Sequence, residues 1–301
     1  MQLDVNQPLY TAGKLQNAFG MQASSLDASK LHLDRARQEL RYQVVETFYA
    51  ALMNEQGGQV GDQQITMATR QLALAKARFD AGSVARLDVL QAEVELANSR
   101  ARRIQARAAV DTSYQAVRTV LSLPQSQPLV LRGSLDERPE VVSRVALESS
   151  IASRPDLRAF TARRDVAEHA VALANTAWKP NLALTGNLQY QDDGFHNLLR
   201  TDNQSYTTEH GLSAATDAAR LEVESSFTAF GAADEVVTTQ QKVRELARGS
   251  VTIAQTYENG VITSAELSDA QVRLLQTEWL LMQAKYSRIV AAARARVAAG
   301  V

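Results

Sequence analysis

An internal repeat is the feature that most restricts what this chain can fold into. The segment FDAGSVARLDVLQAE at 79–93 recurs 178 positions later as YENGVITSAELSDAQ at 257–271, so that Gly82 aligns with Gly260. A repeat at a fixed offset indicates a duplicated structural unit rather than two unrelated domains. Each copy predicts a tight turn between two helices, because glycine tolerates the positive φ that such a turn requires.

The residues on either side of each glycine predict long helices. A helical pattern of apolar residues runs from Leu15 to Phe79, and another follows Gly82 to about Leu121. In the second of these helices, apolar residues recur at alternating steps of three and four, which is the heptad pattern of a coiled coil. This seam consists of Leu87, Leu90, Val94, Ala97, Ala101, Ile104 and Ala108, and the second copy holds Ala265, Ser268, Val272, Leu275, Trp279, Met282 and Tyr286 at the equivalent positions.

Shorter elements surround the two hairpins. A strand is predicted at 3–10 by its loose alternation, with a turn at 11–13, and GGQVG at 57–61 predicts a bend or a loosened turn in the first long helix. A further helix is predicted from Ser153 or Arg154 to Trp178, because Pro155 and Asp156 suit its first turn.

The predicted organisation is a mainly α fold in two repeats. The first repeat covers 1–122, an irregular connector rich in proline covers 123–152, and the second repeat covers 153–301. Within the second repeat, 181–190 alternates as a strand and 191–213 is polar without a period, which predicts a shortened loop. The strand at 181–190 fits either a membrane β-barrel or the edge of a soluble sheet.

The composition argues against several classes of function. Lysine and arginine total 32 against 33 acidic residues, so no net field would attract nucleic acid. Cysteine is absent, and the four histidines lack a spacing that would place two of them with a carboxylate on one helical face. No phosphate-binding loop or nucleophile motif is present. The sequence therefore predicts neither an enzyme nor a cofactor or metal site.

Two observations concern membranes. The first residues, MQLDVNQPLY, contain no secretory signal, and no run of 18 apolar residues free of charge occurs. Any passage of this chain through a bilayer is therefore expected to use strands.

Four segments, in this order and spacing, resemble the TolC-like outer-membrane efflux proteins, also called outer membrane factors. They are QPLYTAGK at 7–14, RFDAGSVARLDVLQAE at 78–93, SRPDLRA at 153–159 leading to WKPNLALTGNLQY at 178–190, and TYENGVITSAELSDAQ at 256–271. The resemblance implies a homotrimer in which each protomer adds antiparallel helical hairpins to a coiled-coil α-barrel and a few short strands to a shared membrane β-barrel. It implies a location in the outer membrane of a Gram-negative cell, extending into the periplasm.

The same resemblance implies a passive export duct, serving as the outer-membrane channel of a tripartite efflux or type I secretion system. Its partners would be a periplasmic adaptor, an inner-membrane pump and outer-membrane lipid. The hairpin tips would contact the adaptor and close the pore. The tip residues are Gly82, Ser83, Val84, Ala85, Gly260, Val261, Ile262 and Thr263.

The resemblance also implies a gate at the second turn. Tyr257, Glu266 and Asp269 match the family there, whereas Ile262 stands where the family has an arginine, so an arginine-centred lock is not implied. Glu266 and Asp269 are three residues apart and share one helical face, where a threefold axis would gather them into a ring that attracts cations. Without the resemblance, both would be ordinary solvated residues of a helix.

Two departures from the family pattern leave other functions open. The family has a helix and a strand before the segment that opens this chain, and a full strand before the second long helix. This chain is therefore expected to be a truncated or internally deleted member. The alternatives are a soluble periplasmic adaptor or scaffold with helical hairpins, and a truncated channel remnant without function. Adaptors flank a single hairpin with β-rich halves, whereas two hairpins are predicted here.

Overall fold

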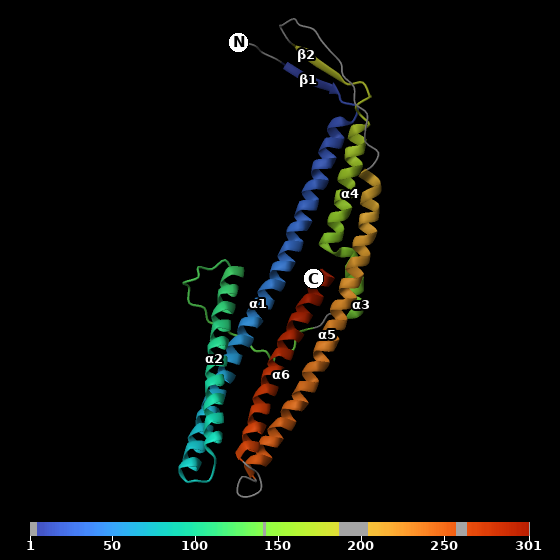
Figure 1. The fold of residues 1–301 in the computed structure, drawn as a ribbon. Coiled ribbons are helices and arrows are strands. Elements are labelled where there is room, and N and C mark those ends of the chain that lie inside the picture. Colours follow the sequence, from blue (N-terminus) through green and yellow to red (C-terminus); the bar gives the residue numbers. More distant parts are fainter. Residues whose placement is uncertain (1–4, 141–142, 187–203, 257–263, 301) are drawn as a thin grey trace. The chain divides into compact units, whose positions relative to one another are not determined.

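Long helices form most of the chain in the computed structural model, which describes residues 5–140, 143–186, 204–256 and 264–300 (Figure 1). Among these residues, no helix combines the length and the hydropathy needed to cross a bilayer. The mainly α fold with long hairpins is therefore confirmed. The elements in order are β1 (Val5–Tyr10), α1 (Lys14–Asp80), α2 (Arg86–Val120), α3 (Arg144–Ser150), the 3-10 turn η1 (Ile151–Ser153), α4 (Pro155–Ala174), β2 (Leu182–Gly186), α5 (Gln204–Thr256) and α6 (Ser264–Ala299).

Three of the predicted elements differ from the structure. Helix α1 continues without a break through 57–61, so the loosened turn predicted as one alternative there is wrong. Helix α4 ends at Ala174 instead of Trp178, because the amides of Thr176 and Ala177 bond to carbonyls three residues back and tighten the chain into turns. Helix α3 and η1 lie inside the connector that was expected to be irregular.

Helix α5 begins at Gln204, within the stretch at 191–213 that was predicted to be a loop. The residues from there to 225 contain no proline, so no residue of this stretch is incompatible with a helix. The absence of an apolar period misled the prediction, because a helix can form without a regular apolar stripe.

The helices pack as two compact units. Unit 1 consists of 1–38, 144–223 and 298–301, and unit 2 consists of 39–143 and 224–297. Helices α1, α5 and α6 contribute residues to both units.

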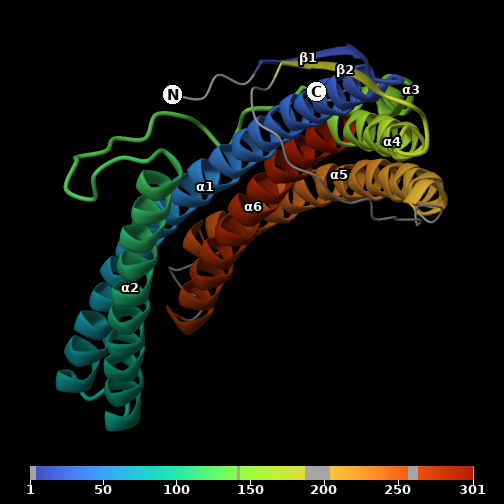
Figure 2. The same cartoon turned by 90° about the horizontal axis from the view of Figure 1, so that it is seen from above.

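In unit 2 the helices follow the order α2, α1, α6, α5, as both views show (Figures 1 and 2). An ion pair between Arg103 and Asp62 joins α2 to α1. Leu52 of α1 packs in one buried cluster with Ile289 of α6. A third contact, made by Val237 of α5 with Leu281 and Ala284 of α6, completes the row. Helices α2 and α5 are therefore the two edges of this unit.

A segment of the connector fastens α6 to α1 inside unit 2. Leu135 is 2% exposed and fills the cluster of Leu52 and Ile289. Beside it, Lys285 of α6 forms an ion pair with Asp136, and its hydrogen bond lowers the pKa of that carboxyl. The next residue, Glu137, accepts a hydrogen bond from the Tyr49 hydroxyl at 3.1 Å. The connector is thus held by apolar and charged contacts at adjacent residues.

The glycines of 57–61 allow neighbouring helices to approach closely. A Cβ atom on Gly57 would lie 2.3 Å from a ring atom of Trp279 in α6. A Cβ on Gly58 would meet the Val110 side chain of α2 at 3.9 Å, which is ordinary contact. Gly57 is therefore required by packing, because the indole occupies the space that a side chain would need.

In unit 1, β1 and β2 pair antiparallel, with Tyr10 opposite Leu182 at the end next to the helices. The strand predicted at 3–10 is confirmed over its described part, Val5–Tyr10, and its turn is confirmed because β1 leads through Ala12 and Gly13, both at positive φ, directly into α1. The predicted strand at 181–190 is described only as far as Gly186.

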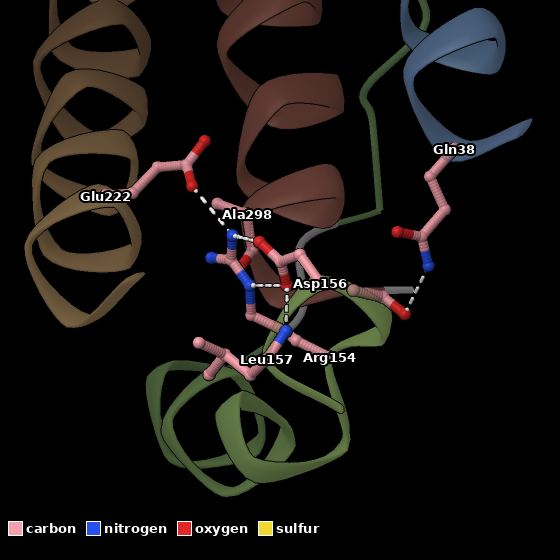
Figure 3. Close-up of polar contacts among 7 residues, drawn as sticks. Gln38, Arg154, Asp156, Leu157, Glu222 and Ala298 are labelled. Atoms are coloured by element: carbon pink, nitrogen blue, oxygen red, sulfur yellow. Dashed lines mark hydrogen bonds and ion pairs between the residues drawn. The ribbon is translucent and has the colours of Figure 1, made fainter. Parts of the chain in front are cut away.

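A buried arginine organises the helices of unit 1 (Figure 3). The Arg154 side chain is 3% exposed, and its Nη1 donates to the carbonyl of Ala298 at 2.7 Å, near the end of α6. Its Nε and Nη2 donate to the two oxygens of Asp156 at 3.0 and 2.6 Å. A third partner is Glu222 of α5, whose Oε2 lies 3.0 Å from Nη2. One side chain therefore links the start of α4 to α5 and α6.

Asp156 serves this cluster and its own helix at the same time. Its Oδ1 accepts a hydrogen bond from the Leu157 amide at 3.0 Å, which satisfies an N–H group in the first turn of α4. Burial alone would raise the pKa of Asp156, but the hydrogen bonds and charge of Arg154 outweigh burial and lower it. The carboxylate therefore stabilises the fold above its unfolded-state pKa, and this contribution is lost as pH falls through its lowered folded-state pKa.

Replacing Gly57 should test the helix contact in unit 2. Gly57→Ala should lower the free energy of unfolding by about 1–3 kcal/mol, because the added methyl group overlaps the Trp279 ring. The matched control is Gly58→Ala, which has room for its methyl and should gain up to about 1 kcal/mol from helix propensity. Urea unfolding followed by circular dichroism measures both. Equal effects of the two substitutions would contradict the close approach at Gly57.

Removing the Arg154 side chain should destabilise unit 1 strongly. Arg154→Ala leaves the carboxylates of Asp156 and Glu222 without their shared partner, so the free energy of unfolding should fall by about 3 kcal/mol. Arg158 is exposed on the same helix, and Arg158→Ala should change stability by no more than about 0.5 kcal/mol. Guanidinium unfolding of the two variants gives the comparison. A similar decrease in the free energy of unfolding at both positions would show that stability depends on the loss of a positive charge and not on the contacts of Arg154.

Candidate functional site

The first hairpin turn is an ordered tip between α1 and α2. Gly82 adopts a φ of 72°, which L-residues with side chains disfavour. Its amide donates to the Phe79 carbonyl at 2.8 Å, and the Ser83 amide donates to the Arg78 carbonyl at 2.9 Å. These two bonds form a Schellman motif, which satisfies carbonyls at the end of α1.

The start of α2 is capped by its own acid. The Ala85 amide donates to Oδ2 of Asp88 at 2.9 Å, so the carboxylate satisfies one of the first unpaired donors and lies at the positive end of the helix dipole. The Arg86 guanidinium lies 5.7 Å from the centre of the Phe79 ring and links the two helices below the turn. The tip is therefore held by local contacts. Of the predicted tip residues, Gly82, Ser83 and Ala85 are exposed and Val84 is half-buried.

The second turn is only partly described. The predicted gate residue Tyr257 and the tip residues Gly260, Val261, Ile262 and Thr263 lie outside the described residues. Both predicted gate acids are exposed near the start of α6, where Glu266 lies in the first turn. Asp269 forms an ion pair with Arg273 one turn further on. The repeat aligns Glu266 with Asp88, which is the capping acid of the first hairpin.

A groove of about 300 Å³ lies beside the first tip, between α1, α2 and α6. Its walls combine apolar side chains, such as Leu74 and Leu275, with the charged groups of Arg78 and Asp88. In the part of the chain that the structure describes, no three histidine, aspartate or glutamate side chains gather where a metal ion could bind. The groove is thus a mixed surface next to the tip.

Helix α2 has two apolar faces, and only one of them is covered. Val89, Ala92 and Leu96 are buried against the rest of unit 2. All seven residues of the predicted seam, from Leu87 to Ala108, are exposed, and Ile104 is 70% exposed. The predicted seam therefore exists as an apolar stripe on the edge of this unit.

The seam of the second hairpin does not lie where the repeat predicted it. In α6 the residue equivalent to Val94, Val272, is 38% exposed, but the next seam member, Leu275, is 6% exposed. The repeat misled here because α6 lies between α1 and α5 and has neighbours on two sides, whereas α2 has one.

Helix α5 carries the uncovered seam of the second hairpin, which the sequence analysis missed. Its exposed apolar residues follow heptad steps, and Leu246 is 74% exposed. These residues are Val236, Val243, Leu246 and Ile253. The steps of seven and three between them are present in the sequence, but the repeat directs attention to α6, whose positions are equivalent to those of α2. Both edges of unit 2 thus present a heptad stripe.

Comparison with known proteins finds similarity to outer-membrane efflux and secretion proteins. Residues 1–122 match the family model described as "Outer membrane efflux protein". The cobalt-zinc-cadmium resistance protein CzcC of Cupriavidus metallidurans is 23% identical over 181 residues, which cover 60% of this chain and 43% of CzcC. The alkaline protease secretion protein AprF of Pseudomonas aeruginosa is 24% identical over an alignment covering 99% of this chain and 69% of AprF.

The fold agrees with these matches. The CmeC outer membrane channel of Campylobacter jejuni superimposes with a TM-score of 0.79 at 16% identity, covering 100% of this chain and 70% of CmeC. The alignment with CzcC spans less than half of the length of CzcC. At such low identity the structural likeness speaks for the fold alone.

Proposed function

We propose that this chain is a member of the outer membrane efflux protein family, whose model residues 1–122 match, and that it forms the outer-membrane channel of a tripartite efflux or type I secretion system. The proteins of this family are transport conduits and not enzymes. The observation that carries the proposal is the pair of uncovered heptad stripes on α2 and α5, the two edge helices of unit 2.

The two stripes favour a ring of identical subunits. One edge presents the α2 seam and the other presents the α5 seam, so the surface of one edge is unlike that of the other. A contact between unlike surfaces repeats from copy to copy and closes into a ring when the rotation allows it. We expect three copies in the ring, as the resemblance to the family implies. The interior of the ring is the passive duct.

Simple counting suggests which residues meet across the contact. Ala97 lies 15 residues after Gly82 on α2, and Leu246 lies 14 residues before Gly260 on α5. If the two turns of neighbouring subunits lie at the same level, these residues face each other in an antiparallel pair. A small side chain opposite a large one is a common way to fill such a seam.

The tips suit the docking of a periplasmic adaptor. The first tip is held by its own hydrogen bonds, so its exposed residues need no ordering when a partner binds. The adjoining groove of about 300 Å³ offers apolar and charged groups within the same surface.

An adaptor role for this chain itself has less support, because the relatives that it matches are channels. The pump and adaptor supply the energy and the choice of cargo.

Cysteine cross-linking should test the ring. The chain has no cysteine of its own, so a chain carrying both Ala97→Cys and Leu246→Cys should give covalent trimers on oxidation. Each single variant should stay uncross-linked, and a mixture of the two should give dimers. Electrophoresis without reducing agent reads out the products.

The control pairs Ala97→Cys with Leu280→Cys, because Leu280 is exposed on α6, which is not an edge helix. This pair should give no covalent dimers or trimers on oxidation. Self-cross-linking of the Ala97→Cys variant alone would show a symmetric contact between like edges and would rule out the proposed ring.

We propose Glu266, Asp269 and Tyr257 as the gate of the second hairpin, with the two acids attracting cations to the pore. Both acids are exposed and lie three residues apart near the start of α6. The ion pair with Arg273 partly neutralises Asp269. Its alignment with Asp88 suggests that Glu266 also caps α6.

Conductance in planar bilayers should test the acids. Replacing Glu266→Gln and Asp269→Asn together should lower the ratio of cation to anion permeability by roughly half, because the ring loses its charge. The control neutralises two exposed acids of α5, Glu235→Gln and Glu245→Gln, which change the net charge equally. An unchanged ratio in the first variant would remove both acids from the gate, while the channel itself would stand if the pore still conducted.

A further inference from the structure

Residues 133–140 of the connector contact both α1 and α6 in unit 2, although they form neither a helix nor a strand. A Cβ atom on Gly133 would lie 3.1 Å from the Phe48 ring of α1, so the connector passes close to that helix. Two residues later, Leu135 is buried in the apolar cluster between α1 and α6. We call residues 133–140 the clasp.

Basic side chains of α6 hold the backbone of the clasp. Nη2 of Arg288 donates to the Glu137 carbonyl at 3.3 Å, and Nη2 of Arg296 donates to the Glu140 carbonyl at 2.7 Å. Side chains and not a strand partner therefore satisfy these carbonyls, which each need a hydrogen bond away from water. The clasp can leave α6 without breaking the backbone hydrogen bonds of that helix.

The clasp also reaches α5. Arg288 is 8% exposed, and its Nη1 lies 3.2 Å from Oδ1 of Asp234 on α5. The other oxygen of Asp234 lies 3.7 Å from Nη2 of Arg138 in the clasp. On the opposite side, the Tyr49 hydroxyl of α1 donates to Glu137. The clasp therefore contacts helices of both hairpins.

Most charged groups of the clasp face water. The side chains of Asp136, Arg138 and Glu140 are 77%, 81% and 95% exposed. Ion pairs of exposed groups add little stability, because water and salt screen both charges. Leu135 is therefore the main anchor of the clasp. A segment with so little buried apolar surface should open at a lower free energy than the helices around it.

We propose that the clasp is a releasable restraint that limits how far the two hairpins of one chain separate. While Leu135 lies between Leu52 and Ile289, α6 is held to α1 at this level, and separation is confined to residues nearer the tips. Release of Leu135 removes this contact and allows α6 to move away from α1 over a greater length. The inference rests on the proposed function and adds the element that regulates the width of the duct.

The alternative is a permanent part of the core, which would open only when all of unit 2 unfolds. Two observations argue against it. The clasp buries one apolar side chain, Leu135, whereas the helices beside it share larger clusters. In addition, Nε of Arg288 is buried without a hydrogen-bond partner among the described residues. The site is therefore not fully satisfied while the clasp is bound, and an unsatisfied buried donor lowers the stability of that state.

Proteolysis of the folded full chain should test the release. Leu135→Asn should free the clasp, because an amide is costly to bury in an apolar cluster. A glutamate-specific protease should then cut after Glu137 and Glu140 roughly tenfold faster than in the natural chain. The matched control is Val130→Asn, which introduces the same residue into the same connector at a position that is 79% exposed. Mass spectrometry of the fragments gives the rates.

The emission of Trp279 reports on the separation of α6 from α1, since its ring packs against Gly57. The chain has two tryptophans, so a Trp178→Phe background leaves Trp279 alone. There, Leu135→Asn should raise the quenching of this emission by acrylamide by roughly twofold, whereas Val130→Asn should not. In planar bilayers, Leu135→Asn should raise the mean conductance of each channel by roughly half, because the duct opens more widely.

A milder variant guards against a fold disturbed at Leu135. Asp136→Asn keeps the apolar anchor and removes the charge that pairs with Lys285. Each of the three readings should change in the same direction by a smaller amount, because the clasp is weakened and not freed. If circular dichroism shows that Leu135→Asn lowers the helix content, the readings of Asp136→Asn decide the question.

The outcomes separate the clasp from the channel. If neither variant is cut faster than the natural chain, the clasp is not releasable and the proposal is overturned. If cleavage is faster but the quenching of Trp279 or the conductance is unchanged, the clasp does not restrain α6 and the proposal is likewise overturned, while the channel stands. If the natural chain forms no conducting pore, the proposed function fails, whereas cleavage and quenching still decide whether the clasp holds α6 to α1.

Discussion

The structure depends on one constraint: a row of long helices cannot cover the outer faces of its own edge helices. Helix α6 has packed neighbours on both sides, and its heptad residues are largely used inside the unit. Helices α2 and α5 have a neighbour on one side only, so each retains an exposed seam. Burying apolar surface is the main source of stability in a helical fold, and we propose that part of this burial comes from contact with another chain.

Local features of this fold were predictable from the sequence because their causes lie within a few residues. Gly82 and its flanking residues specify the first turn, since glycine, the Schellman bonds and the acid at Asp88 all act over a single turn of helix. The start of α4 follows from Pro155 and Asp156 for the same reason. The long helices followed from their apolar period, and the exposed α2 seam from its heptad steps.

Features that depend on which helices are neighbours were not predictable in this way. Gly57 suggested a bend or a loosened turn when only its neighbours in the sequence were considered. Its structural role is contact with Trp279, which lies 222 positions away and cannot be identified from the local sequence. Arg154 was predicted only as one of two residues at which the helix could start, yet its partners Glu222 and Ala298 come from distant helices. The α5 seam was missed because the repeat suggested equivalence between helices whose positions in the row differ. Duplication preserved the hairpin but not its surroundings.

The seating of Trp279 against Gly57 also limits how the second hairpin can move. An indole lodged in the gap left by a glycine resists sliding of α6 along α1, because each step would drive the ring into the side chain of the next residue. Separation of α6 from α1 below this level leaves the contact between Trp279 and Gly57 in place. If the chain forms the proposed duct, its opening would therefore use separation of the helix ends and not sliding of one helix along the other.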